Sequence, residues 1–119
     1  MKTGYVPKRG DLIWLDFTPQ AGHEQAGRRP AAVISNSRYN QKVGLLVACP
    51  ITSQQKQYPF EVLLPEGLPI SGVILADQAR NLDWKSRRAA FIGRVGQDTL
   101  AEILGKLSVL LNDDNLTDD

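Results

Sequence analysis

The chain has 119 residues, enough for one domain to bury a core without disulfide bonds or structural metal. Its single cysteine, Cys49, excludes an intramolecular disulfide, and no apolar run reaches the about 20 residues that cross a bilayer. The net charge is +1, but residues 1–112 carry 14 basic and 9 acidic side chains, a balance of +5 that is compatible with a polyanionic partner. We therefore expect a cytoplasmic protein with one domain over residues 1–111 and a flexible acidic tail over residues 112–119.

Short apolar runs bounded by turn formers predict three strands in the first half of the chain. They cover residues 11–17, 31–35 and 44–49. The third run surrounds Cys49 with apolar side chains, so we expect a buried and unreactive thiol. Pro50 is expected to end this strand, with residues 51–53 continuing extended. Residues 36–42, between the second and third runs, predict a turn or a short helical insertion.

The second half is expected to add strands and to finish with a helix. The strands cover residues 60–64, 71–76 and 90–95, with a polar segment between the last two. From Thr99 to Leu111 the apolar residues recur at helical spacing, and Thr99 followed by Glu102 matches a capping box. Short strands followed by one amphipathic helix are typical of a small β-barrel with a helix packed on it, so we expect a mainly β fold.

A long polar connection separates the first two predicted strands. It covers residues 18–30, a stretch of 13 residues, and connections of that length are usually functional or disordered. Because a predicted strand adjoins each end, we interpret it as a functional loop. Glu24 is a candidate general base and Arg29 a candidate positive charge for cleavage of a phosphodiester, and Gly27 between them lets the loop bend. The structural alternative is a surface salt bridge that contributes little.

Several common catalytic sites do not fit this sequence. His23 is the only histidine and has no second His or Cys near it, so we expect no metal site. A Ser-His-Asp triad has the residue types it needs, but no Gly-x-Ser-x-Gly pattern is present. The candidates for such a triad are Ser35, Ser53, His23 and Asp77. No glycine-rich phosphate loop followed by Lys and Ser or Thr occurs, which argues against nucleotide hydrolysis.

Other residues have both a functional and a structural interpretation. Thr52 is either a phosphate ligand at a strand end or a β-former beside a turn. Residues 85–88 either follow a phosphate backbone or form a solvated basic loop. Trp14 and Trp84 either stack on bases of single-stranded nucleic acid or belong to the core or an interface.

Five short blocks occur in an order that points to one family. They are Gly-Asp-Leu-Ile-Trp at 10–14, Glu-Gln-Ala-Gly-Arg-Arg-Pro at 24–30, Pro-Ile-Thr-Ser at 50–53, Tyr-Pro-Phe-Glu-Val at 58–62 and Leu-Ala-Asp-Gln at 75–78. Together they resemble the MazF/PemK (Kid) family of toxin endoribonucleases, also called mRNA interferases. The resemblance extends from about Tyr5 to Leu111.

This resemblance implies a small SH3-like barrel with short helical insertions and a C-terminal helix, assembled as a homodimer. It implies cleavage of single-stranded RNA without metal or cofactor, by attack of a 2′-hydroxyl on the adjacent phosphorus. The products would be a 2′,3′-cyclic phosphate and a 5′-hydroxyl. Glu24 would be the general base and Thr52 would bind the scissile phosphate. Arg29 would either stabilise the phosphorane or also protonate the leaving oxygen, and we favour the electrostatic role because arginine seldom donates a proton. The RNA-binding residues would be His23, Gln25, Arg28, Ser53, Lys56, Asp77, Gln78 and Trp84.

Different positions of this sequence resemble two different branches of the family. His23 resembles the Kid/PemK branch, in which a histidine at this position helps to bind or cleave RNA. That branch has an arginine where this chain has Leu75, and residues 58–62 and 75–78 resemble the MazF branch instead. We therefore expect the MazF-type machinery and an ACA-containing cleavage site. The resemblance also implies a MazE-like antitoxin whose acidic, flexible segment covers the RNA groove, which suits the basic domain.

Two other functions remain to be separated from the endoribonuclease. One is a catalytically silent barrel that binds RNA or an antitoxin-like peptide through the same groove. Loss of Arg29 or Thr52 would indicate it, and both residues are present. The other is a purely structural dimerising barrel, which would leave the long polar connection without a role.

Overall fold

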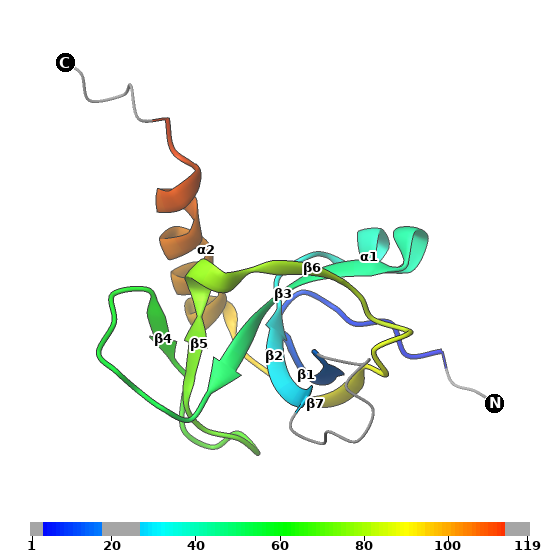
Figure 1. Ribbon diagram of the computed structural model, residues 1–119, viewed down its shortest axis with the longest axis horizontal. Coiled ribbons are helices and arrows are strands. Elements are labelled where there is room, and N and C mark those ends of the chain that lie inside the picture. Colours follow the sequence, from blue (N-terminus) through cyan, green and yellow to red (C-terminus); the bar gives the residue numbers. More distant parts are fainter. Residues whose placement is uncertain (1–3, 18–26, 114–119) are drawn as a thin grey trace.

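The computed structural model describes residues 4–17 and 27–113. Three residues to which sequence analysis assigns a role, His23, Glu24 and Gln25, lie outside the described residues, as do residues 114–119 of the predicted tail. The strands and helices follow the predicted order along the chain (Figure 1).

The three strands predicted in the first half are present. They are β1 (Asp11–Asp16), β2 (Arg28–Val33) and β3 (Leu45–Thr52). They pair antiparallel, with Leu12 opposite Ala32 and Ala32 opposite Cys49. β2 begins three residues earlier than predicted, so Arg28 and Arg29 belong to a strand and not to the loop.

The prediction that Pro50 ends the third strand is wrong. One edge of β3 pairs with β6 (Arg80–Asp83) through Leu45–Ala48 and then with β5 (Val73–Leu75) through Ile51 and Thr52. Pro50 lies in the gap between these two partners, where a missing backbone N–H removes no ladder hydrogen bond on that edge. The strand therefore continues through the proline.

The remaining elements are α1 (Ser37–Val43), β4 (Glu61–Leu63), the short 3₁₀ helix η3 (Ala76–Gln78), β7 (Ala90–Arg94) and α2 (Gln97–Leu111). They differ from the predictions at three places. Sequence analysis missed η3, whose first residue, Ala76, was expected to end a strand. It also missed β6, which lies in the segment interpreted as a polar connection. The capping box is also wrong, because α2 starts at Gln97 with Gly96 as its N-cap and no side-chain cap.

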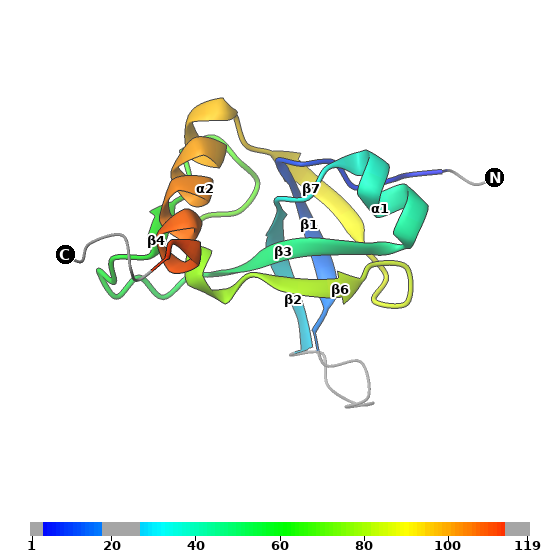
Figure 2. The same ribbon diagram turned by 90° about the horizontal axis from the view of Figure 1, so that it is seen from above.

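The strands form an open sheet in the order β4-β5-β3-β2-β1-β7, with β6 paired to β3. β4 and β7 therefore end the path without closing it, so the word barrel describes the sheet only loosely. The mainly β fold with a C-terminal helix is confirmed. Helix α2 and β4 lie at one end of the molecule and α1 at the other (Figure 2).

β1 separates two hydrophobic clusters. Leu12 faces a cluster that includes Cys49, Ile74 and Ile103 of α2, whereas Ile13 faces a second cluster. Adjacent residues of a strand point to opposite faces, so each face of β1 contributes to one cluster. The prediction of a buried thiol is confirmed, because Cys49 is fully buried and burial raises its pKa to about 12.

Trp84 belongs to the second cluster and not to an RNA surface. Its side chain is 6% exposed, and its Nε1 donates a 2.9 Å hydrogen bond to the carbonyl oxygen of Asn40. A ring that stacks on a base must present one face to solvent, so this burial argues against the predicted role of Trp84 in RNA binding. Trp84 packs the core beneath α1 instead.

Candidate active site

Pairing of β2 with β3 brings the strand ends that carry Arg29 and Thr52 near one another. The paired residues are Ala31 with Pro50, Ala32 with Cys49 and Val33 with Ala48. Arg29 and Thr52 each lie two residues beyond the Ala31–Pro50 pair, at the same end of this ladder. Both residues line the same two surface pockets.

The larger pocket, which we call the Tyr58 pocket, has a volume of about 580 Å³. It lies between Arg29 and Thr52 on one side and the segment that joins β3 to β4 on the other. Its lining is Arg29, Thr52, Gln54, Lys56, Gln57, Tyr58, Pro59, Glu61, Leu75 and Gln78. Two cations, several hydrogen-bonding side chains and one exposed aromatic ring suit a ligand that combines phosphate with bases.

The second pocket, which we call the Ile70 pocket, has a volume of about 510 Å³ and is also lined by Arg29 and Thr52. Its lining is Arg28, Arg29, Pro30, Ile51, Thr52, Ser53, Pro69, Ile70 and Ser71. Because both pockets share Arg29 and Thr52, an extended ligand that fills both would pass across this pair of side chains.

The segment between β3 and β4 is held by the Glu61 carboxylate. One oxygen accepts a 2.9 Å hydrogen bond from the backbone N–H of Lys56, and the other accepts a 3.1 Å bond from Gln57. Gln57 has a φ of 63°, a conformation that costs energy for a residue with a side chain. Glu61 thus compensates for a strained turn that forms one wall of the Tyr58 pocket.

Asp77 acts on the Tyr58 pocket through Tyr58. The Tyr58 hydroxyl donates a 2.6 Å hydrogen bond to Oδ2 of Asp77, and this bond raises the pKa of Tyr58. Asp77 does not itself line either pocket, and its Oδ1 is buried without a hydrogen-bond partner among the described residues. The structure therefore gives Asp77 a contact with Tyr58 where sequence analysis expected contact with RNA.

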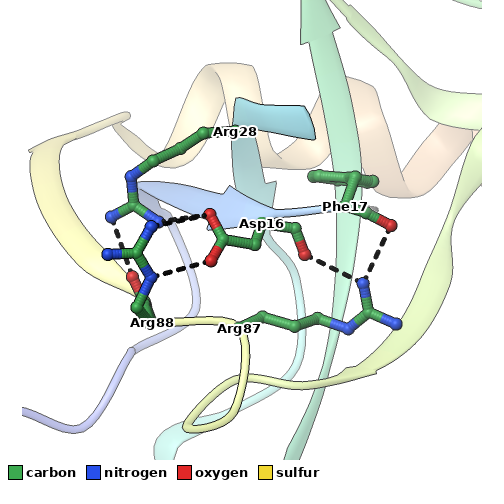
Figure 3. Close-up of polar contacts among 5 residues, drawn as sticks. All are labelled: Asp16, Phe17, Arg28, Arg87 and Arg88. Atoms are coloured by element: carbon green, nitrogen blue, oxygen red, sulfur yellow. Dashed lines mark hydrogen bonds and ion pairs between the residues drawn. The ribbon is translucent and has the colours of Figure 1, made fainter. Parts of the chain in front are cut away.

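The Arg28 side chain is bonded to other groups of the protein. Its Nη1 lies 2.9 Å from Oδ1 of Asp16, and its Nη2 donates a 2.9 Å hydrogen bond to the carbonyl oxygen of Arg88 (Figure 3). The Arg88 guanidinium binds the same carboxylate, and the hydrogen bonds from Arg88 and Arg28 lower the pKa of Asp16. The predicted RNA contact of Arg28 has to compete with these bonds. Arg87 and Arg88 likewise bind protein groups, which neither interpretation of the basic run anticipated.

The pockets gather most of the described candidates. The predicted residues that line them are Arg28, Arg29, Thr52, Ser53, Lys56 and Gln78. Sequence analysis did not include Gln54 and Glu61 in the site, and it interpreted residues 58–60 either as another stacking face or only as the entry to a strand. The exposed aromatic in a polar run between two strands was the signal for Tyr58, whereas the role of Glu61 depends on backbone contacts that leave no sequence pattern.

Two negative observations apply to residues 4–17 and 27–113. In this part of the chain there is no group of three or more His, Cys, Asp or Glu side chains that could hold a metal ion. Within the same residues, no helix is both long and apolar enough to cross a membrane.

Comparison with known proteins identifies the family. Residues 8–111 match the model of the PemK-like, MazF-like toxins of type II toxin-antitoxin systems. The chain belongs to this family. It is 48% identical to the endoribonuclease toxin MazF of Escherichia coli (strain K12) over 111 residues, which cover 93% of this chain and 99% of that protein.

Solved structures agree with this assignment. A crystal structure of MazF (Form-I) from Deinococcus radiodurans has 59% sequence identity and a TM-score of 0.83, and the match covers 91% of this chain and 98% of that one. A crystal structure of MazE-MazF (Form-II) from the same organism has 52% identity and a TM-score of 0.81, with 91% and 97% of the two chains covered. All three relatives carry the name MazF, in agreement with the branch that residues 58–62 and 75–78 favour.

Proposed function

We propose that this chain is the toxin of a type II toxin-antitoxin system and an endoribonuclease that cleaves single-stranded RNA without metal. The observation that carries this proposal is that Arg29 and Thr52 line the same two open pockets. A polynucleotide lying through both pockets would place one phosphate at this pair and a nucleotide on each side. The relatives named as endoribonucleases support the same activity.

The chemistry requires a base and a positive charge at that phosphate. In the proposed reaction, the Glu24 carboxylate takes the proton of a ribose 2′-hydroxyl, and the 2′-oxygen bonds to the adjacent phosphorus. Arg29 stabilises the charge on the phosphorane and Thr52 donates a hydrogen bond to a phosphate oxygen. The bond from phosphorus to the 5′-oxygen then breaks, leaving a 2′,3′-cyclic phosphate. A guanidinium does not give up its proton in proteins, so Arg29 acts as a charge and the 5′-oxygen takes its proton from water.

The remaining pocket residues would hold the RNA on either side of this phosphate. Ser53 lies in the Ile70 pocket, whereas Lys56 and Gln78 lie in the Tyr58 pocket. The ring of Tyr58 is 45% exposed and supplies a surface on which a base can stack. We propose that these four residues, together with His23 and Gln25, contribute to RNA binding.

The proposed partner is a MazE-like antitoxin with an acidic segment. The crystal structure that contains MazE with MazF supports such a partner. The basic balance of residues 1–112 favours an acidic chain in the groove that RNA would use. We further propose a cytoplasmic homodimer in which the domain ends with α2 at Leu111 and the acidic residues beyond it form a tail.

The decisive experiment is incubation of the purified protein with a long single-stranded RNA in EDTA, followed by mapping of the cut sites and analysis of the new 3′ ends. We expect site-specific cuts with cyclic phosphate ends that Arg29→Ala and Glu24→Gln both abolish. Arg38→Ala is the matched control, because Arg38 lies on the surface of α1, away from both pockets. Intact RNA that still binds would favour the silent binding module. Cleavage that survives in both site variants would overturn the mechanism.

A further inference from the structure

We propose that four residues around the end of β1 position Arg29 and thereby set the rate of RNA cleavage through bonds that they make within the protein. These residues, which we call the Asp16 cluster, are Asp16, Arg28, Arg87 and Arg88 (Figure 3). The inference rests on the proposed function, because it concerns the rate of that reaction.

One carboxylate holds two strands and a turn together. Asp16 is the last residue of β1 and lies opposite Arg28, the first residue of β2. Its Oδ1 accepts from Arg28 Nη1 at 2.9 Å and from Arg88 Nη2 at 3.3 Å, while its Oδ2 accepts from Arg88 Nε at 2.8 Å. Arg88 belongs to the turn between β6 and β7. Both carboxylate oxygens are therefore used, and they join three separate segments.

Main-chain hydrogen bonds reinforce the same junction. Nη1 of Arg87 donates to the carbonyl oxygens of Asp16 at 2.9 Å and Phe17 at 3.0 Å. In return, the backbone N–H of Asp16 donates to the carbonyl oxygen of Arg87 at 2.9 Å. The backbone N–H of Phe17 donates to Gly27 at 2.6 Å, so both ends of the connection from β1 to β2 are fixed here.

Arg29 is the residue that these contacts position. It is the direct chain neighbour of Arg28 and lies opposite Leu15, the neighbour of Asp16. Because Arg28 and Arg29 are consecutive residues of β2, the bonds that fix Arg28 also restrain the main chain from which the Arg29 side chain reaches the two pockets. A displacement of about 1 Å in a catalytic group can cost up to about a hundredfold in rate, so this restraint has a measurable consequence.

Direct contact with RNA is the competing role for these arginines, and burial and bonding argue against it. The Asp16 side chain is 17% exposed and the Arg28 side chain 29% exposed. Nη1 of Arg87 donates hydrogen bonds to two backbone carbonyl oxygens. The Arg88 side chain is 69% exposed. An experiment therefore has to separate its ion pair with Asp16 from a direct contact with RNA.

The test compares Arg88→Ala, Asp16→Asn and the double variant in the full-length protein. Single-turnover cleavage of an RNA oligonucleotide that spans a mapped cut site gives the rate. The Kd is measured with the same oligonucleotide carrying a 2′-deoxy nucleotide at the cleaved bond. We expect Arg88→Ala to lower the cleavage rate about tenfold and to leave the Kd and its salt dependence unchanged. The double variant should be no slower than Asp16→Asn, because both changes remove the same interaction.

Other results overturn the inference. A higher Kd with a smaller salt dependence would mean that Arg88 contacts a phosphate directly. Rate losses that add in the double variant would mean that Arg88 and Asp16 act independently. Wild-type cleavage rates in Arg88→Ala, alongside Arg38→Ala as control, would overturn the inference and leave the proposed function intact. If the wild-type protein cuts no RNA in this assay, the proposed function and the inference fail together.

Discussion

Gly72 lies directly against the main chain of Thr52. A Cβ atom at Gly72 would overlap the carbonyl oxygen of Thr52 and would come within 3.2 Å of Cα of Ser53. The φ of Gly72 is +128°, which residues with a side chain rarely adopt. Only glycine at position 72 therefore allows the start of β5 to approach the end of β3 this closely. This close approach supports the strand end that carries Thr52.

Gly72→Ala should therefore damage both stability and cleavage. The change introduces strain of about 1–2 kcal/mol from its φ and a further cost of about 1–3 kcal/mol from overlap with Thr52. Gly67→Ala is the matched control, because Gly67 also has a positive φ of +94° but nothing lies within 4 Å of its Cβ position. Denaturant unfolding and cleavage rates of both variants check the prediction. Equal effects in the two variants would show that contact with Thr52 is unimportant.

Glu61→Gln should weaken RNA binding more than it weakens the fold. The Glu61 carboxylate accepts from the backbone N–H groups of Lys56 and Gln57, and an amide can replace only one of these two acceptors. Loss of one bond to a charged acceptor costs about 1.5–3 kcal/mol locally, in a segment that is otherwise exposed. We expect the Kd for RNA to rise several-fold with a small change in Tm. Glu66→Gln, in an exposed turn outside both pockets, is the control and should resemble the wild type.

The sequence predicts an element of this fold well where the element depends on its own residues, and poorly where it depends on distant parts of the chain. β1 and β3 were predictable because their apolar runs are continuous. β6 was not, because Leu82 is its only buried residue, and its strand conformation comes from pairing with β3. The start of α2 was misplaced because a glycine N-cap has no side-chain signal, whereas Thr99 and Glu102 imitate one.

The same distinction applies to the site. Arg29 and Thr52 were predictable because each adjoins a loop that interrupts an apolar run. The Asp16 cluster was not, because Asp16 and Arg88 are 72 residues apart in sequence. Basic residues that look like a phosphate-binding run therefore turned out to bind a carboxylate and backbone carbonyls, a result that only the tertiary structure can supply.

The acid stability of the protein should depend on Asp16. Hydrogen bonds from Arg88 and then Arg28 hold the pKa of Asp16 below its ordinary value of 3.8. A carboxylate with a lowered folded-state pKa stabilises the fold above its unfolded-state pKa, and this stability is lost as the pH falls through the folded-state value. We expect the wild-type Tm to fall more than that of Asp16→Asn between about pH 5 and about pH 3. Parallel Tm profiles for the two proteins would contradict this assignment.

The Cys49 thiol should resist modification in the native protein. It is fully buried, and burial, with a smaller contribution from the Asp77 charge, raises its pKa to about 12. The thiolate is the reactive species, so almost none is present near neutral pH. We expect maleimide to label Cys49 only after unfolding, as measured by mass spectrometry. Ser86→Cys adds an exposed thiol as an internal control, and labelling of both thiols at similar rates in the native state would refute the prediction.

The two tryptophans should differ in their response to a neutral quencher. Trp84 is 6% exposed and Trp14 is 36% exposed, so acrylamide should quench fluorescence strongly in Trp84→Phe, which retains only Trp14, and weakly in Trp14→Phe. Trp84→Phe should also lose about 1–3 kcal/mol of stability, because the carbonyl oxygen of Asn40 loses its indole donor. RNA affinity per folded molecule should not change in that variant. If it falls while Tm does not, Trp84 would belong to the RNA-binding surface after all.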